Sequence, residues 1–209
     1  MSKNNLKRFI NKIFYRPVIK ISGGGGNLIA IPDSVSARRV SIEIYGSNNK
    51  IIVGEGAYLH NTRIRVGFSN CPVENCIVKI GDSTSFNEVL IQLGESDSVV
   101  EVGSGCMCSH GIELNCTDHH TIFNADGEVI NVGKSIKIGS KVWICKNVKV
   151  MKNTNVPDGC VLAQNSIITK NFTQENCIIA GNPGRVVKEN IRWDRLRPQN
   201  ALRGLKANP

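Results

Sequence analysis

The sequence predicts an all-β solenoid, and two observations carry this prediction. From Ile138 to Phe172 an aliphatic residue recurs at every sixth position. Aromatic residues make up only 5% of the chain, whereas 20 of the 209 residues are glycine. Self-similarity at a short fixed period is typical of solenoids, and scarce rings with frequent small residues favour narrow coils over a thick sandwich.

The repeat itself decides between helix and strand. Six residues turn an α-helix through a net angle of about 240°, so a helix cannot keep one apolar face at this spacing. Six residues can form one short strand and one corner. The aliphatic positions are Ile138, Ile144, Val150, Val156, Leu162 and Ile168, and fragments of the pattern begin at Val53, Ile80 and Val102. Such hexapeptides resemble those of left-handed parallel β-helix proteins, in which three repeats form a triangular coil.

Interruptions of the repeat divide the chain. We expect a β-helix domain over residues 21–188, with a loop at 67–76 and a larger excursion at 117–135, and a basic C-terminal tail over 189–209. Loops that leave a rigid solenoid are where functional side chains often lie. Residues 1–20 have apolar positions at helical spacing in a basic background, which predicts an amphipathic helix. This helix could cap the solenoid, contact a membrane surface or contact another subunit.

The net charge of +9 is concentrated at the two ends of the chain. The middle has no basic stripe with interleaved aromatic residues, so we expect no nucleic-acid partner. A phosphorylated cofactor or a membrane surface accounts for the charge equally well. There is no secretory signal or spanning apolar run, so the eight cysteines are expected as free thiols in the cytoplasm, with the protein at the inner face of the membrane if the first helix binds there. Their spacing matches no zinc motif, and we expect no metal.

Three of the four histidines fall within 11 residues, at His110, His119 and His120. The stretch Thr117-Asp-His-His-Thr-Ile-Phe, followed by Ile138-Gly-Ser-Lys-Val-Trp-Ile, resembles the hexapeptide O-acetyltransferases, in particular those of capsule and polysialic acid. The segments 106–113 and 181–193 are similar too, so the resemblance covers roughly residues 80–193. The combination is far more specific than the repeat alone.

The resemblance implies an enzyme in which His120 is the general base for attack of a sugar hydroxyl on a thioester. It places the donor for the tetrahedral oxyanion at Trp143, through the backbone N–H or the indole. Ser109, His110, Glu113, Asp118 and His119 would lie on the acceptor side. Either Asp118 or Glu113 could orient the imidazole.

The resemblance also implies acetyl-CoA as co-substrate, in a slot between subunits of a homotrimer. Cys145 and Lys146 would lie beside the thioester arm, and Ala163 and Gln164 would line the pantetheine arm through backbone groups. Thr169, Lys170, Arg185 and Lys188 would hold the nucleotide phosphates, as fixed cations pair well with phosphate. Two positions depart from the family: Cys145 replaces a glycine, and Thr121 replaces a proline.

The sequence is also compatible with other functions. The same fold could N-acetylate an amino-sugar or another small acceptor, since no residue distinguishes amine from hydroxyl. A metal hydratase of the γ-carbonic anhydrase type would need three histidine ligands, and adjacent histidines on a strand do not both reach one metal. A purely structural solenoid would leave the histidine cluster unexplained. The sequence therefore favours O-acetylation of a carbohydrate, with the acceptor unidentified.

Overall fold

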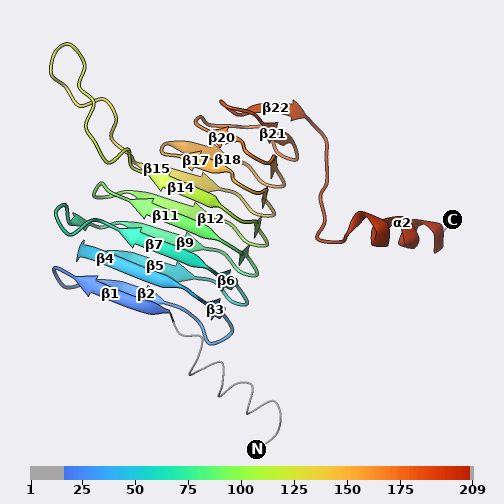
Figure 1. Ribbon diagram of the computed structural model, residues 1–209, viewed down its shortest axis with the longest axis horizontal. Coiled ribbons are helices and arrows are strands. Elements are labelled where there is room, and N and C mark those ends of the chain that lie inside the picture. The colour runs from blue at the N-terminus through green and yellow to red at the C-terminus, as the bar shows by residue number, and fades with distance from the viewer. Residues whose placement is uncertain (1–16, 208–209) are drawn as a thin grey trace, which may run out of the picture.

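A computed structural model describes residues 17–207 (Figure 1). The chain winds into a left-handed parallel β-helix with three sheets, which confirms the predicted fold class. Sheet A contains β1 (Val18–Ser22), β4 (Ser41–Ser47), β7 (Thr62–Val66), β11 (Val89–Leu93), β14 (Ile112–Cys116), β17 (Lys149–Met151) and β20 (Ile167–Ile168), with β8 (Val73–Glu74) paired on β4. Each coil passes from sheet A to sheet B and then to sheet C.

The other two sheets complete the triangle. Sheet B contains β2 (Leu28–Ala30), β5 (Lys50–Val53), β9 (Ile77–Ile80), β12 (Val99–Val102), β15 (Ser135–Ile138) and β18 (Thr154–Val156). Sheet C contains β3 (Ser36–Arg38), β6 (Tyr58–His60), β10 (Ser85–Phe86), β13 (Met107–Cys108), β16 (Trp143–Ile144), β19 (Val161–Leu162), β21 (Ile178–Ala180) and β22 (Arg185–Lys188). All pairings are parallel except that of β22 on β21.

The core is a stack of side chains from successive coils. In sheet A, one column runs through Ile42, Ile64, Ile91, Leu114, Val150 and Ile168, all fully buried. Neighbouring residues along each strand point outward, as the alternating burial of β4 shows. Burial of each such side chain stabilises the fold by about 1.5–3 kcal/mol before entropic costs. The aliphatic positions of the repeat are therefore the inward positions of the coil.

The coils differ in length along the molecule. Ile42 stacks on Ile64, a step of 22 residues, whereas Val150 stacks on Ile168, a step of 18. The early coils take more residues because their sheet A strands are longer: β11 has five residues and β20 has two. Hexapeptides fit three to a coil only where the coil takes 18 residues. This is why the repeat is regular after residue 138 and ragged before residue 100.

Small residues allow the coils to stack at the corner between sheets B and C. A Cβ on Gly103 would lie 2.6 Å from the Gly139 carbonyl carbon, and one on Gly81 would lie 2.6 Å from that of Gly103. Asparagine serves at other corners, where the backbone is left-handed, as at Asn153 and Asn165. The polar and small positions of the hexapeptide are thus corner positions.

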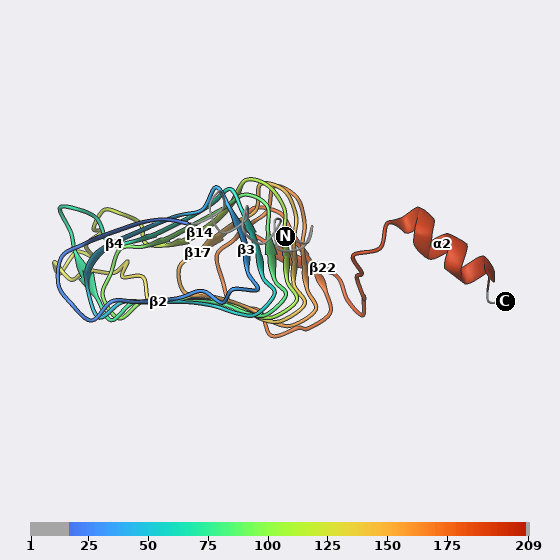
Figure 2. The same cartoon turned by 90° about the horizontal axis from the view of Figure 1, so that it is seen from below.

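The coil is flattened, as the view along the stack shows (Figure 2). Sheets A and B form the two long sides, and sheet C closes one end. The corner where sheet A meets sheet B, here called the A–B corner, lies at the opposite end and carries the loops at 67–76 and 117–134. The two ends of this flattened section hold different groups of the predicted site residues.

The termini differ in part from expectation. The predicted helix of residues 1–20 lies outside the described residues up to residue 16, and Val18 already begins β1. The tail predicted over 189–209 contains a helix, α2 (Pro198–Ala207), that stands apart from the coils. None of the helices described could cross a membrane. All eight cysteines are free thiols, and Cys160 faces inward as its place in the repeat predicts.

Candidate active site

The largest excursion from the coils is residues 117–134, between β14 in sheet A and β15 in sheet B (Figure 1). It projects as a hairpin in which Phe123 and Val129 form an antiparallel bridge. The Asn124 backbone N–H donates to the Glu128 carbonyl at 3.0 Å and closes the tip. The loop thus has internal structure, and both of its ends lie at the A–B corner.

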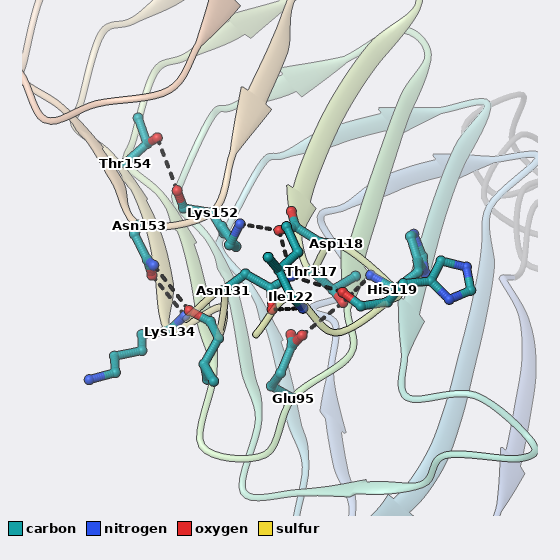
Figure 3. A network of polar contacts seen from close by, with 12 residues as sticks. Glu95, Thr117, Asp118, His119, Ile122, Asn131, Lys134, Lys152, Asn153 and Thr154 are labelled. Atoms are coloured by element: carbon teal, nitrogen blue, oxygen red, sulfur yellow. Dashed lines mark hydrogen bonds and ion pairs between the residues drawn. The ribbon is translucent and has the colours of Figure 1, made fainter. Parts of the chain in front are cut away.

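A half-buried carboxyl anchors the first end of this loop (Figure 3). Glu95 follows β11 at the same corner, one coil earlier, and its Oε1 accepts a hydrogen bond from Thr117 Oγ1 at 2.9 Å. Thr117 Oγ1 in turn accepts the backbone N–H of His119 at 3.1 Å. His119 has a left-handed backbone, with φ of 63°, where the chain turns out of the coil. The Thr117 hydroxyl therefore fixes this turn.

The Glu95 carboxyl is in a poor environment for a negative charge. Burial raises the pKa of Glu95, the nearby Asp118 carboxylate adds to this, and the hydrogen bond from Thr117 opposes it. Its Oε2 is buried and has no hydrogen-bond partner within residues 17–207. A buried oxygen without a partner is tolerated better on a neutral carboxyl than on an ionised one.

Asp118 ties the two ends of the loop to the next coil (Figure 3). Its Oδ2 accepts from Lys152 Nζ, which follows β17, and from Asn131 Nδ2 at 3.0 Å. Partial burial alone would raise the pKa of Asp118, but the hydrogen bonds from Lys152 and Asn131 outweigh it and lower the pKa. Asn131 Nδ2 also donates to the His120 carbonyl at 2.8 Å. One amide therefore joins the outgoing and returning strands at His120.

The two adjacent histidines differ in what their side chains contact. The His119 ring packs edge-on against Phe68, with 5.2 Å between ring centroids, and points away from the carboxylates. The His120 side chain is exposed and makes no hydrogen bond to any described residue. The arrangement leaves the His120 imidazole free to meet a group from outside the chain.

The remaining acceptor-side candidates lie elsewhere. Ser109 and His110 follow β13 at the corner between sheets C and A, with the whole of β14 between them and the loop. Glu113 pairs with Lys149 at 3.0 Å on the outer face of sheet A. The structure therefore brings Asp118 and His119 to His120 and leaves the other three apart.

Trp143 lies on the outer face of β16 in sheet C. Sheet C closes the end of the flattened coil opposite the loop (Figure 2). Its backbone N–H donates to the Cys160 carbonyl at 2.9 Å as part of the sheet. The backbone N–H is thus already used within the sheet, and a donor role of Trp143 toward an oxyanion stays a prediction. The indole N–H has no partner in the described part of the chain and stays available.

Among the residues predicted to bind acetyl-CoA, Ala163 likewise uses its backbone N–H in the sheet. The Ala163 backbone N–H donates to the Ile179 carbonyl at 2.8 Å, so it is not free to bind a ligand. Cys145 is half-buried, and burial raises the pKa of its thiol to about 11. Lys146 and Gln164 are exposed beside it. Cys145, Lys146, Ala163 and Gln164 thus lie on two successive coils, at the corner where sheet C turns toward sheet A.

The candidates for phosphate binding are exposed on the last coils but not on one element. Thr169 and Lys170 follow β20 in sheet A, and the Lys170 ammonium lies 5.5 Å from the centre of the Phe172 ring. Arg185 and Lys188 lie in β22 on sheet C, and neither forms an ion pair with a described residue. No group of three or more histidine, cysteine or acidic residues is arranged to hold a metal ion within 17–207.

No model of a known protein family matches the sequence. The polysialic acid O-acetyltransferase of Neisseria meningitidis is 31% identical over 189 residues, which cover 82% of this chain and 87% of that protein. The chain belongs to the hexapeptide-repeat O-acetyltransferase family. As a member of that family it is an acyltransferase.

Solved structures agree with this membership. The polysialic acid O-acetyltransferase OatWY has a TM-score of 0.69 and 26% identity, covering 91% of this chain and 98% of that one. The polysialic acid-specific acetyltransferase NeuO has a TM-score of 0.64 and covers 92% of this chain and 99% of its own. At 24% identity, the likeness to NeuO shows the shared fold alone.

Sequence reasoning missed three residues that hold the loop of His119 and His120: Glu95, Asn131 and Lys152. Two of them could have been found from the number of residues that separates stacked positions on successive coils. Glu95 precedes Thr117 by 22 residues, close to the 23-residue step from Leu93 to Cys116 in this part of the chain. Lys152 follows Asp118 by 34 residues, close to the 36-residue step that includes the loop. Stacking by coil length, rather than by hexapeptide, would have placed both beside the loop.

Proposed function

We propose that the protein transfers an acetyl group from acetyl-CoA to a hydroxyl of a carbohydrate, with His120 as general base. The observation that carries the proposal is the His120 imidazole, exposed and uncommitted on a loop whose backbone is fixed by Asn131 and Thr117. The name polysialic acid O-acetyltransferase, which both the Neisseria meningitidis protein and the OatWY structure carry, supports a carbohydrate acceptor. An acidic polysaccharide is therefore the first acceptor to test.

The proposed reaction needs one proton relay and no covalent enzyme intermediate. The neutral His120 imidazole removes the hydroxyl proton as the oxygen attacks the thioester carbonyl carbon. A tetrahedral oxyanion forms, then collapses with cleavage of the C–S bond. The imidazolium returns its proton to the departing thiolate, so that acetyl ester and CoA thiol leave a neutral histidine. General base catalysis of this kind contributes typically about 10²–10⁴-fold.

A second copy of the chain supplies the rest of the proposed site. In one chain the His120 loop and Trp143 occupy opposite ends of the flattened coil. A cyclic homotrimer would bring the loop of one copy to sheet C of the next, in agreement with the predicted slot between subunits. There the free indole N–H of Trp143 would donate to the oxyanion, a contribution of the kind that preorganised donors make.

Acetyl-CoA would lie along the edge of sheet C in this assembly. Cys145, Lys146 and Gln164 border the path of its pantetheine arm, with the Ala163 contribution limited to groups other than its N–H. The cations Lys170, Arg185 and Lys188, with Thr169, are exposed near the last coils, where nucleotide phosphates would bind. Because Cys145 is half-buried and its pKa is raised to about 11, its thiol is a neutral neighbour and not a nucleophile.

The test supplies acetyl-CoA with polysialic acid, a neutral polysaccharide and an amino-sugar, and follows acetylated product by mass spectrometry. A thiol reagent is less suitable because Cys71 is exposed and would react. We expect O-acetylated polysaccharide, and His120→Ala to lower kcat by about 10²–10⁴-fold. His119→Ala serves as the control and should cost much less. Full turnover by His120→Ala would contradict the assignment of the base, and acetylation of the amine alone would contradict the acceptor class.

A further inference from the structure

The segment after the last strand returns along the outside of the β-helix. Residues 189–197, here called the strap, descend from β22 across earlier coils at the corner between sheets B and C (Figure 1). The Ile191 backbone N–H donates to the Asn176 carbonyl at 2.8 Å. The Trp193 indole N–H donates to the Lys141 carbonyl at 2.6 Å. The strap therefore contacts coils far from the one it leaves.

Arg195 fixes the far end of the strap. Its guanidinium donates to the Cys106 carbonyl at 2.7 Å and to Ser85 Oγ at 2.8 Å, and longer bonds at 3.4 Å reach the carbonyls of Ser83 and Gly105. A planar guanidinium with several donors suits such a cluster of oxygens. The side chains of the neighbouring Arg192 and Arg197 form no hydrogen bond or ion pair in the part of the chain described. The basic C-terminal cluster thus contains one cation with a structural role.

The strap places its tryptophan against the one on sheet C. The ring centroids of Trp143 and Trp193 lie 6.0 Å apart with planes inclined by 43°. Both rings are half-buried, and these are the two tryptophans of the chain. The hydrogen-bond roles differ: the Trp193 N–H is used by Lys141, whereas the Trp143 N–H has no described partner. The Trp193 indole is thus held by a hydrogen bond, whereas the Trp143 indole packs against the Trp193 ring and keeps its N–H free.

We propose that Trp193 is a positioning residue, which holds the Trp143 indole in the orientation that presents its free N–H to the acetyl carbonyl oxygen. The inference rests on the proposed function, since it presumes that role for Trp143. An outward-pointing tryptophan on a strand has more than one staggered rotamer open to it. A tilted aromatic contact favours one of them by about 2-fold to 10-fold. Donors that are oriented before reaction stabilise an oxyanion without reorganising during the step.

The kinetic test compares Trp193→Leu, Trp193→Phe and Arg195→Met. We expect Trp193→Leu to lower kcat by about 5-fold to 10-fold with the KM for acetyl-CoA within about 2-fold, because the oriented donor acts on the transition state. Trp193→Phe keeps a ring against Trp143 and should restore most of the rate. Arg195→Met should resemble Trp193→Leu because it releases the strap. Arg192→Met is the matched control and should behave as wild type.

A spectroscopic test reports the orientation without reference to turnover. Trp193→Phe and Trp193→Leu each leave Trp143 as the sole tryptophan. We expect its fluorescence anisotropy to be lower, and its quenching by acrylamide about 2-fold faster, in Trp193→Leu than in Trp193→Phe. Both variants should melt within a few degrees of each other, which separates positioning from a global loss of fold.

The outcomes separate the positioning role from the proposed function. Equal anisotropy and quenching in the two single-tryptophan proteins would overturn the positioning role. An unchanged kcat in Trp193→Leu, combined with a low kcat in Trp143→Leu, would also overturn the positioning role. That result would not contradict the proposed function. An unchanged kcat in Trp143→Leu would instead remove the proposed role of Trp143, and this inference with it.

Discussion

The two ends of the flattened coil hold their functional side chains by different means. At the A–B corner, charged and polar partners from the adjacent coils fix the loop: Glu95 from one side and Lys152 from the other. At sheet C, an aromatic contact fixes Trp143, and the partner comes from a strap that reaches Ser85, 110 residues earlier in the chain. The loop end depends on coil stacking and on charge, whereas the sheet C end depends on the C-terminal segment. Neither end alone makes the proposed site.

The largest expected effect comes from mixing two inactive variants. His120→Ala and Trp143→Leu are each expected to be slow as homo-oligomers. When the two are co-assembled in equal amounts, about one quarter of the contacts in a cyclic trimer would pair an intact His120 with an intact Trp143. We expect turnover to recover to about that fraction of wild type. Activity is measured on differentially tagged, co-purified complexes.

Each variant alone, taken through the same assembly step, is the control for this experiment. If co-assembly gives no recovery while both variants remain folded and oligomeric, His120 and Trp143 do not act across one subunit contact. The proposed arrangement of the two ends would then be wrong, although each residue could still matter separately.

A smaller effect is expected from the cation that holds the loop. Lys152→Met removes a partner of Asp118 and leaves a partly buried carboxylate with Asn131, so we expect a loss of stability of about 1–3 kcal/mol. The loosened loop should lower kcat by about 10-fold, since small misplacements of a catalytic group are costly. Stability is measured by urea unfolding and kcat by product formation.

Lys149→Met is the matched control, because Lys149 pairs with Glu113 on the open face of sheet A. Exposed pairs of this kind contribute roughly 0–1 kcal/mol. Equal effects of the two substitutions on kcat would show that Lys152 has no particular role at the loop.

The smallest effect concerns the ionisation of Glu95. Because its pKa is raised in the folded state, the folded protein favours the protonated carboxyl, and ionisation costs stability. That cost is absent below the ordinary pKa of 4.5 and grows as the pH rises through the folded pKa. Glu95→Gln keeps the oxygen that accepts from Thr117. We therefore expect the variant to gain Tm relative to wild type at pH 8 and to show no gain at pH 4.

Asp118 has the opposite shift, so it provides the internal comparison. Its lowered pKa contributes stability above the ordinary value of 3.8, and this contribution is lost as the pH falls through the folded pKa. Asp118→Asn should thus be less stable than wild type at pH 8 and approach it in acid. A Glu95→Gln protein that is destabilised at pH 8 would contradict the account of Glu95.

Much of the fold could be predicted because the coil repeats. Strict spacing at Ile138, Ile144 and Val150 is incompatible with a helix and compatible with short strands and corners. The longer early coils could not be recognised in the same way. Their extra residues lengthen the sheet A strands, where buried and exposed residues alternate, and this breaks the six-residue spacing. The 117–134 loop was visible because polar and turn residues replaced the repeat.

The site was predicted less completely, for physical reasons that differ by residue. His120, the proposed base, was predicted from a motif that is contiguous in the chain. Lys152 and Glu95 meet the loop through stacking, which requires the true coil length. Pairing within a parallel sheet uses the backbone N–H of an interior strand, so the hydrogen bond from the Trp143 N–H to the next coil could have been expected from its place in the repeat alone. The Trp193 contact joins residues 50 positions apart, Trp193 after the last strand and Trp143 in β16, and has no local signal.

The strap should also affect the order in which the coils unfold. In a solenoid each coil contacts its neighbours, so melting can begin at an end and proceed coil by coil. Here the Trp193 and Arg195 bonds join the segment after the last strand to coils well inside the stack. While these hydrogen bonds persist, the C-terminal coils cannot unfold one at a time. Hydrogen exchange should therefore show the final strands opening together with the middle of the stack rather than before it.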